Sequence, residues 1–172
     1  MDDQGSILIL GLGSEILRDD GIGPRLARDL RTHFTSKHFR FNTSTVGGLE
    51  IIDLIKGYQI VFIIDGMKSK ESQPGEVYFM DTDHFKETLH LSNIHDASFH
   101  TALKLGSEIG AKIPKSIFII GVGVEEDTEF GETFTHTLQD EYVNILKKIH
   151  QFIVNQFKML EVPASIDTIK GG

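Results

Sequence analysis

Acidic side chains stand directly after two of the strands that this sequence predicts. Asp65 follows the apolar run 60–64, and Asp19 and Asp20 lie between an earlier apolar run and a predicted helix. An ionised carboxylate at the end of a buried strand costs free energy unless it is paired or bound to a metal ion. Asp65 is therefore a candidate for chemistry, although aspartates at strand ends also commonly close turns.

The adjacent acids before the first helix, Asp19 and Asp20, can likewise have either a structural or a chemical role. A carboxylate at a helix start can accept hydrogen bonds from free backbone N–H groups and interact favourably with the helix dipole. One helix needs only one such cap, so we expect either Asp19 or Asp20 to cap it. The other would then be free to face a crevice.

Histidines are the remaining candidates for metal ligands or proton carriers, and residue type alone does not show which of them has such a role. A single histidine is more often structural than a ligand or a proton carrier. Three of the eight histidines, His84, His90 and His95, fall in the segment 81–98, where no clear periodicity predicts a helix or strand, and His100 stands just before a predicted helix.

A glycine motif after the first strand suggests a nucleotide site but does not complete one. Gly11 and Gly13 match the start of a dinucleotide-binding fingerprint, whereas the third glycine is replaced by Ile16. The second predicted strand ends in residues 43–45, none of which is the acid that would hold a ribose. A nucleotide-binding α/β domain is therefore the weaker alternative.

The elements that would position these residues alternate between strand and helix. Strands are predicted at 6–10, 40–46, 59–64, 75–80 and 116–120, with 75–80 at the sheet edge. Helices are predicted from Ile22 onward, at 49–55, around 102–109 with Ala102, Leu105 and Ile109 on one face, and from Thr137 through 152. This alternation predicts an α/β fold with a mostly parallel sheet between two layers of helices. Its functional crevice should lie beyond the carboxyl ends of the strands, where Asp20 and Asp65 fall.

Composition narrows the class of protein. A chain of 172 residues fits one domain, expected over residues 1–159 and followed by a tail at 160–172. The net charge of -8 argues against nucleic acid as a partner, and the absence of cysteine excludes disulfides, thiolate zinc sites and a cysteine nucleophile. No apolar run approaches a membrane span, so we expect a cytoplasmic monomer with no membrane partner.

Several segments together resemble the [NiFe]-hydrogenase maturation endopeptidases. The order and spacing agree with that family from Ile7 to Ile153. The matching segments are Asp19-Asp20-Gly21-Ile22-Gly23, Ile63-Ile64-Asp65-Gly66 with the turn Pro74-Gly75-Glu76-Val77, His95 ahead of a helix, and Ile119-Ile120-Gly121-Val122.

The resemblance implies a twisted five-stranded sheet in a three-layer α/β/α fold and a metal-contacting set at Asp20, Asp65 and His95. It implies an endopeptidase that removes the C-terminal tail of a nickel-loaded large-subunit precursor. The nickel would come with the substrate, no cofactor would be tightly bound, and other divalent ions could occupy the site. On this basis His90 and His100 are expected to be dispensable.

Two positions depart from the family pattern. Ser14 stands where the family commonly has asparagine, and residues 43–48 stand where it often has Asp-Gly-Gly-Thr, a segment linked to substrate recognition. A changed recognition segment also fits the alternative of a non-catalytic protein that senses or holds a nickel-bearing partner. The absence of cysteine favours water attack assisted by a carboxylate or a metal over a covalent thiol route.

Overall fold

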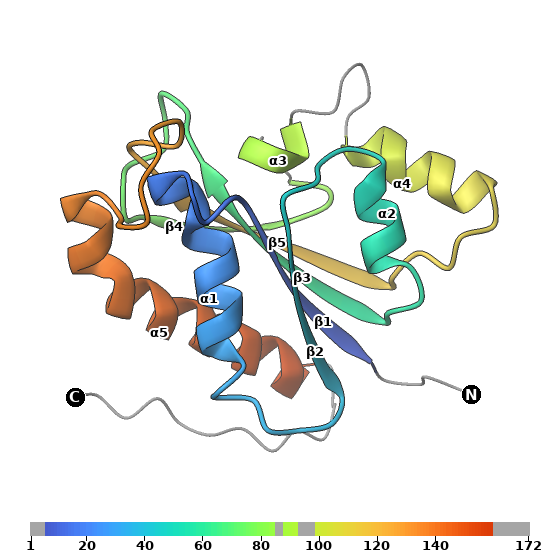
Figure 1. Ribbon diagram of the computed structural model, residues 1–172. Helices are drawn as coiled ribbons and strands as arrows, with labels where there is room; N and C mark the ends of the chain where they lie inside the picture. Colours follow the sequence, from blue (N-terminus) through green and yellow to red (C-terminus); the bar gives the residue numbers. More distant parts are fainter. Residues whose placement is uncertain (1–5, 85–87, 93–98, 160–172) are drawn as a thin grey trace.

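The computed structural model describes residues 6–84, 88–92 and 99–159, and it has helices on both faces of one sheet (Figure 1). The strands are β1 (Ile7–Leu12), β2 (Phe39–Ser44), β3 (Ile60–Met67), β4 (Val77–Asp81) and β5 (Ser116–Gly123). The helices are a 3-10 turn η1 (Arg18–Gly21), α1 (Ile22–Leu30), α2 (Glu50–Ile55), α3 (Leu89–Ser92), α4 (Phe99–Glu108) and α5 (His136–Met159).

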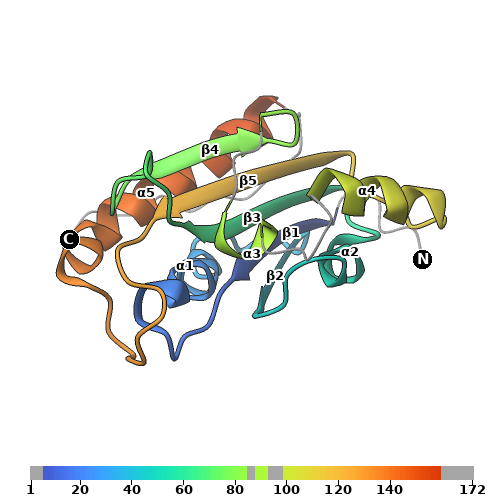
Figure 2. The same cartoon turned by 90° about the horizontal axis from the view of Figure 1, so that it is seen from above.

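The five strands form one sheet in the order β2-β1-β3-β5-β4. All neighbouring pairs are parallel except β4, which runs antiparallel to β5 along the edge (Figure 2). This arrangement confirms the predicted three-layer fold, including the placement of the fourth strand at the sheet edge.

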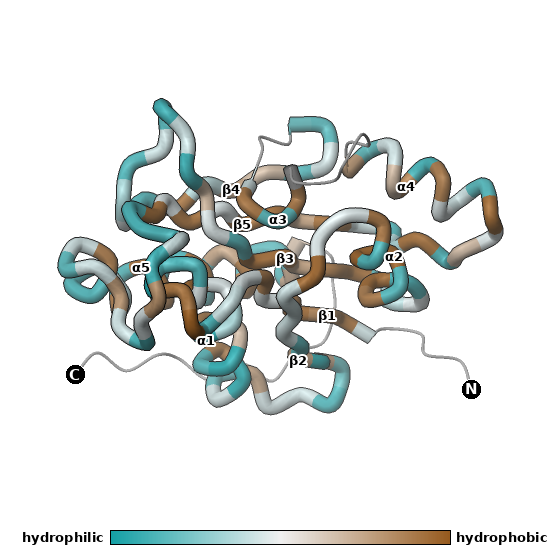
Figure 3. The backbone as a smooth tube through the Cα atoms, turned by 45° about the horizontal axis from the view of Figure 1, so that its top comes forward, coloured by the Kyte–Doolittle hydropathy of each residue, from teal (hydrophilic) through white to brown (hydrophobic). Residues whose placement is uncertain are grey.

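Successive residues of the central strands supply two separate hydrophobic cores. In β1, Ile9 packs into the core under α1 and α5, whereas Leu10 packs into the core under α2 and α4. A strand that is covered on both faces needs apolar residues at every position, which explains the unbroken apolar runs of β1 and β3. Figure 3 shows these hydrophobic strands at the centre and mostly hydrophilic segments at the periphery.

The face that α4 buries differs from the predicted one. Leu105 and Ile109, expected in the core, are 42% and 74% exposed. The helix buries Ala102, as expected, together with Phe99 and Gly106. A Cβ atom at Gly106 would lie 3.0 Å from side-chain atoms of Ile52 and of Ile113, so the glycine is the point of close packing. The prediction for Leu105 and Ile109 was wrong because the buried face of α4 carries a glycine at position 106 instead of a large apolar residue.

The last helix begins one residue before Thr137, which was expected to lie at its N-terminus. Thr135 precedes the helix, and its backbone carbonyl accepts a hydrogen bond from the N–H of Gln139 at 2.9 Å. α5 extends to Met159 and covers one face of the sheet (Figures 1 and 2). Neither α5 nor any other described helix combines the length and apolar content that a membrane span requires.

The chain changes faces of the sheet between β1 and β3. The connection through α1 lies on one face, and the connection through α2 lies on the other (Figure 1). The β1–β3 ladder ends at the pair Gly11–Ile64, immediately before Asp65. In open α/β sheets a crevice for ligands forms where the connections diverge in this way.

Candidate active site

Glycines bring the start of α1 against the ends of the central strands. A Cβ atom at Gly23 would lie 2.3 Å from the carbonyl oxygen of Leu12 and 2.5 Å from that of Ile64. Gly13 adopts φ +134°, and a Cβ atom there would collide with the backbone of Asp20. These glycines therefore allow close helix–strand packing, which sets Asp20 at the carboxyl ends of the central strands. We call the region marked there by Asp20, Asp65 and His90 the crevice.

Asp20 lies in η1 with its carboxylate facing the crevice. One oxygen, Oδ2, accepts a hydrogen bond of 2.7 Å from the backbone N–H of Ser14. The other oxygen, Oδ1, lies 3.5 Å from Nε2 of His90. The side chain of Asp20 retains 7% of its exposure, so it is the more accessible of the two carboxylates beside His90.

Asp65 lies inside β3, which continues two residues beyond it to Met67. Its side chain is fully buried and accepts three hydrogen bonds. Oδ2 accepts from the Thr88 hydroxyl at 2.5 Å and from the His90 backbone N–H at 2.9 Å, and Oδ1 lies 2.7 Å from Nδ1 of His90. These donors offset the cost of burying the charge and hold α3 against the end of the sheet.

His90 lies between the two carboxylates. Because a carboxylate can only accept, Nδ1 of His90 carries the proton that bonds Asp65, and Nε2 is left facing Asp20. The short helix α3 is seated by two glycines. A Cβ atom at Gly47 would lie 2.6 Å from the carbonyl oxygen of His90, and one at Gly66 would lie 2.9 Å from Leu89.

The proton affinities of Asp20 and His90 reflect this arrangement. Burial raises the pKa of Asp20, and the charges of Asp65 and Asp127 add to the increase, against the opposing effects of His90 and the Ser14 N–H. Burial lowers the pKa of His90, but the hydrogen bond that its Nδ1 donates to Asp65 and the charges of Asp65 and Asp20 outweigh this effect, so the net pKa is raised. Groups perturbed in this way inside a crevice are candidates for proton transfer.

Asp19 has a different role from its neighbour, and neither residue caps α1. No side-chain hydrogen bond caps η1 or α1. Asp19 instead accepts from the backbone N–H groups of Glu125 and Glu126 at 3.1 Å and from both the N–H and the hydroxyl of Thr135 at 2.7 Å. Asp19 therefore fastens the loop that follows β5, and Asp20 is the residue that faces the crevice.

The three predicted site residues are not all placed by the structure. Asp20 and Asp65 lie on either side of one imidazole, and that imidazole belongs to His90. His95 lies outside the described residues, so its assignment stays a prediction. His90 was not selected as a site residue because the segment around it has no periodicity that predicts a helix or strand. The nearby sequence feature that points to a site is Thr88, whose hydroxyl can donate a hydrogen bond to a buried acid.

Metal binding at this crevice would need donors from outside the described part of the chain. Within that part, no group of three or more His, Asp or Glu side chains is arranged to hold an ion. Nε2 of His90 and Oδ1 of Asp20 are the two atoms turned toward each other, while both oxygens of Asp65 already accept hydrogen bonds. Asp65 thus has the geometry of a residue that orients an imidazole, as carboxylates behind metal-bound histidines do.

A polar pocket adjoins this crevice at the end of β1 and β2. It is lined by Gly13, Glu15, Pro24 and residues 43–45. These include the segment that departs from the family pattern. The pocket is therefore in the right place to contact a substrate that reaches Asp20.

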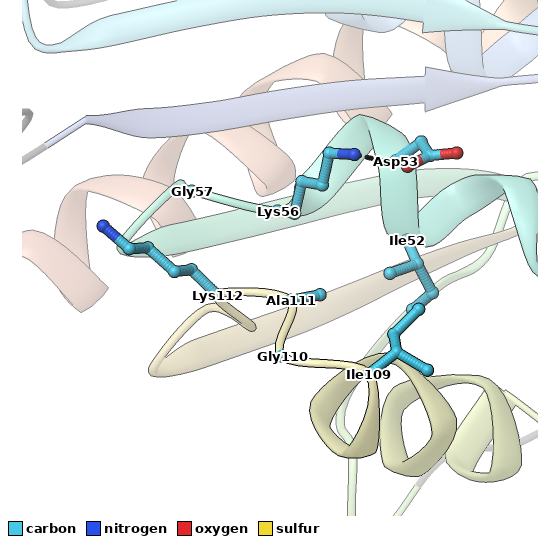
Figure 4. A pocket seen from close by; sticks show the side chains of 8 residues that line it. All are labelled: Ile52, Asp53, Lys56, Gly57, Ile109, Gly110, Ala111 and Lys112. Atoms are coloured by element: carbon cyan, nitrogen blue, oxygen red, sulfur yellow. Dashed lines mark hydrogen bonds and ion pairs between the residues drawn. The ribbon is translucent and has the colours of Figure 1, made fainter.

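A second pocket lies at the other end of the sheet, beside the amino ends of β3 and β5 (Figure 4). Its lining comes from the end of α2 and from the turn at 109–112, which precede β3 and β5 respectively. Its single acid, Asp53, pairs with Lys56 at 2.6 Å, and Lys112 also lines it. The pocket lacks the histidine and the buried carboxylates of the crevice at the carboxyl edge, so we do not assign it catalysis.

Comparison with known proteins agrees with the fold. The chain is 21% identical over 156 residues to the hydrogenase expression/formation protein HupD of Thiocapsa roseopersicina, covering 89% of this chain and 70% of that protein. The structure resembles the hydrogenase maturating endopeptidase HybD of Escherichia coli with a TM-score of 0.67, 21% identity and coverage of 88% and 93% of the two chains. It resembles the [NiFe] hydrogenase maturation protease HybD of Thermococcus kodakarensis with a TM-score of 0.57, 24% identity and coverage of 86% and 98%.

Residues 24–152 match the sequence pattern of the HycI hydrogenase maturation proteases. The matched region contains most of the sheet, Asp65 and His90, and it covers well over half of the chain. Membership of a peptidase family favours the peptidase over the nucleotide-binding alternative, and catalysis over simple binding. The chain belongs to the hydrogenase maturation protease family and is a peptidase.

Proposed function

We propose that this protease removes the C-terminal tail of a [NiFe]-hydrogenase large-subunit precursor. The observation that carries the proposal is the convergence of Asp20, Asp65 and His90 at the point where the connections diverge. The family membership supplies the reaction class, hydrolysis of a peptide bond. The crevice supplies groups that can move the two protons that this hydrolysis requires.

The raised pKa values suit Asp20 and His90 for opposite parts of the reaction. A water molecule loses a proton as its oxygen bonds to the scissile carbonyl carbon, and the departing amine gains one as the C–N bond breaks. Asp20, with a raised pKa, would accept the proton from water. His90, whose raised pKa favours the imidazolium, would donate a proton from Nε2, while Asp65 holds the ring by Nδ1.

We further propose that the crevice contacts nickel that the substrate carries. Oδ1 of Asp20 is a hard donor that can bind Ni²⁺, and a single donor here leaves most coordination positions for the substrate. Nε2 of His90 carries the proton that it transfers, so it is not a ligand in this scheme. A site this open should hold a free ion weakly, so the enzyme should keep its fold when treated with a chelator. Asp65 and His95, the other members of the predicted set, would orient or complete this contact.

Substrate choice would depend on the pocket beside the crevice. Its wall at residues 43–45 offers the hydroxyl groups of two threonines and a serine where relatives often carry an acid. A different set of hydrogen-bonding groups at this wall would select a different precursor. Exchange of the four residues 43–46 for Asp-Gly-Gly-Thr should therefore change which precursor is cleaved.

The test is cleavage of purified precursor in nickel-loaded and nickel-free forms, followed by intact mass spectrometry. We expect a single cut that releases a C-terminal peptide from the loaded form and negligible cleavage of the nickel-free form. Equal cleavage of both forms would refute nickel docking and leave the protease assignment intact. No cleavage of any loaded precursor encoded beside this gene would contradict the proposed function.

A further inference from the structure

Two loops at the carboxyl edge of the sheet are fastened to each other. We call residues 14–18, after β1, and 125–133, after β5, the paired loops; they run side by side near the start of α1 (Figures 1 and 2). Gly131 donates its N–H to the carbonyl of Ile16 at 2.9 Å and accepts from the N–H of Arg18 at 2.8 Å. The two segments thus form a short parallel bridge at Leu17 and Gly131.

The paired loops display two large apolar side chains to solvent. Phe130 is 82% exposed, the highest value among the large hydrophobic residues that are exposed in the described chain, and Ile16 is 59% exposed. Their backbones are adjacent, because Phe130 directly precedes the glycine that bonds to Ile16. Aromatic residues that stand out from a surface are frequent anchors of protein–protein interfaces.

Internal hydrogen bonds hold the longer loop in this conformation. The carboxylate of Glu126 accepts from the N–H and hydroxyl of Thr128 and from the N–H of Glu129, and its pKa is lowered to about 2. Arg18 pairs with Glu129 at 3.2 Å. A loop that is already ordered loses little conformational entropy when a partner binds, so Phe130 is displayed at low cost.

The loop around Phe130 is also strongly acidic. Between 125 and 132 the chain has five acids and no base; they are Glu125, Glu126, Asp127, Glu129 and Glu132. Arg18 and Lys68 pair with two of these acids, Glu129 and Asp127, from outside the segment. An apolar anchor surrounded by net negative charge is complementary to an apolar side chain flanked by lysine or arginine.

The paired loops are continuous with the crevice. Only three residues separate Ile16 from Asp20, and Asp19 joins the two loops through Glu125 and Glu126. The charge of Asp127, in the longer loop, also raises the pKa of both Asp20 and His90. A polypeptide seated on Phe130 and Ile16 would therefore extend into the crevice.

We infer that the paired loops are a docking surface for a basic, apolar segment of the protein substrate, anchored by Phe130 and Ile16. The inference rests on the proposed function, because it takes the occupant to be the protein that the crevice cleaves. The complementary charge and the continuity with Asp20 favour this occupant over a second copy of the same acidic chain.

The experiment measures binding and cleavage of a nickel-loaded large-subunit precursor that the wild-type enzyme processes. Phe130→Ala and Ile16→Ala are compared with Ile109→Ala, a matched control because Ile109 is 74% exposed on the segment after α4, near the opposite sheet edge. Glu132→Gln is compared with Glu108→Gln in the same way. Affinity is measured by biolayer interferometry in an Asp20→Asn background, so that bound precursor is not consumed.

We expect Phe130→Ala to raise Kd and KM about 10- to 30-fold, Ile16→Ala to raise them a few-fold, and the control at Ile109 to leave them unchanged. Glu132→Gln should weaken the increase of Kd with salt, whereas Glu108→Gln should not. Wild-type Kd and KM for Phe130→Ala, with the precursor still cleaved by wild-type enzyme, would overturn the docking surface and leave the proposed function standing. Homodimers that Phe130→Ala dissolves would assign the surface to a second copy instead.

Discussion

Asp19 and Asp20 are adjacent and buried, yet they belong to different regions of the molecule. Asp19 holds the paired loops together, because its two oxygens accept four hydrogen bonds from residues 125, 126 and 135. Asp20 belongs to the crevice, where one oxygen bonds a single backbone N–H and the other faces His90 at 3.5 Å. The difference lies in how fully the charge of each is satisfied within the fold.

The number of hydrogen-bond donors around each carboxylate distinguishes the structural Asp19 from the functional Asp20. A buried acid that is surrounded by N–H and O–H donors stabilises the folded state and has no oxygen left for a substrate. A buried acid with an oxygen turned toward an imidazole costs stability and remains available for chemistry. The two regions should therefore respond to mutation in opposite ways.

Replacement of Asp20 by alanine should have the largest effect, and the effect should be on catalysis. Loss of a positioned group that transfers protons lowers rates by about 10²- to 10⁴-fold. We expect the rate of precursor cleavage to fall by at least 100-fold, while the melting temperature stays within a few degrees of wild type. A variant that cleaves at more than a tenth of the wild-type rate would contradict the assignment of Asp20 to proton transfer.

Replacement of Asp19 by alanine should instead destabilise the fold. The change leaves the N–H groups of Glu125, Glu126 and Thr135 without their acceptor, at a cost of about 3 kcal/mol. For a chain of this size that cost lowers the melting temperature by about 6–12 °C in differential scanning calorimetry. Asp53→Ala is the control, because its ion pair with Lys56 is exposed and should contribute little. Equal melting temperatures for Asp19→Ala and the control would remove the proposed distinction between the two aspartates.

Replacement of Asp20 by asparagine should raise stability at neutral pH by a smaller amount. Because the folded-state pKa of Asp20 is raised above 3.8, its ionisation costs stability, and this cost appears as pH rises through the folded-state pKa. Asparagine keeps an acceptor for the Ser14 N–H and removes the charge. We expect Asp20→Asn to melt above wild type at pH 7.5, with a difference that shrinks as pH falls through the raised folded-state pKa and is lost below about 4. A difference in melting temperature that grows on acidification would contradict the raised pKa of Asp20.

The sequence was sufficient to predict the sheet and its functional edge. Five strands were expected, and the described part of the chain has five. The unbroken apolar runs of β1 and β3 are visible locally because both faces of these strands are buried. Asp65 could be selected for the same reason, since it ends the apolar run of the most β-like segment. The choice between Asp19 and Asp20 could not be made, because it depends on the loop after β5, more than 100 residues away.

His90 could not be predicted from its local sequence. α3 has only four residues, too few for a periodic pattern, and its position depends on contacts with Gly47 and Gly66 from distant parts of the chain. The buried face of α4 was misassigned for a related reason, since Gly106 gains its importance only through Ile52 and Ile113. In both places long-range packing at a glycine outweighs the local pattern.

The central claim is that His90, held by Asp65 and facing Asp20, takes part in cleavage. The most direct test is a time course of nickel-loaded precursor processing by wild type, His90→Ala and His90→Gln, followed by intact mass spectrometry, with His95→Ala alongside to test the prediction made from the family resemblance. We expect both His90 variants to fold, to bind the precursor and to cleave it at least 100-fold more slowly than wild type. Cleavage by His90→Ala at the wild-type rate would contradict the account, because the imidazole between the two carboxylates would then have no part in the reaction.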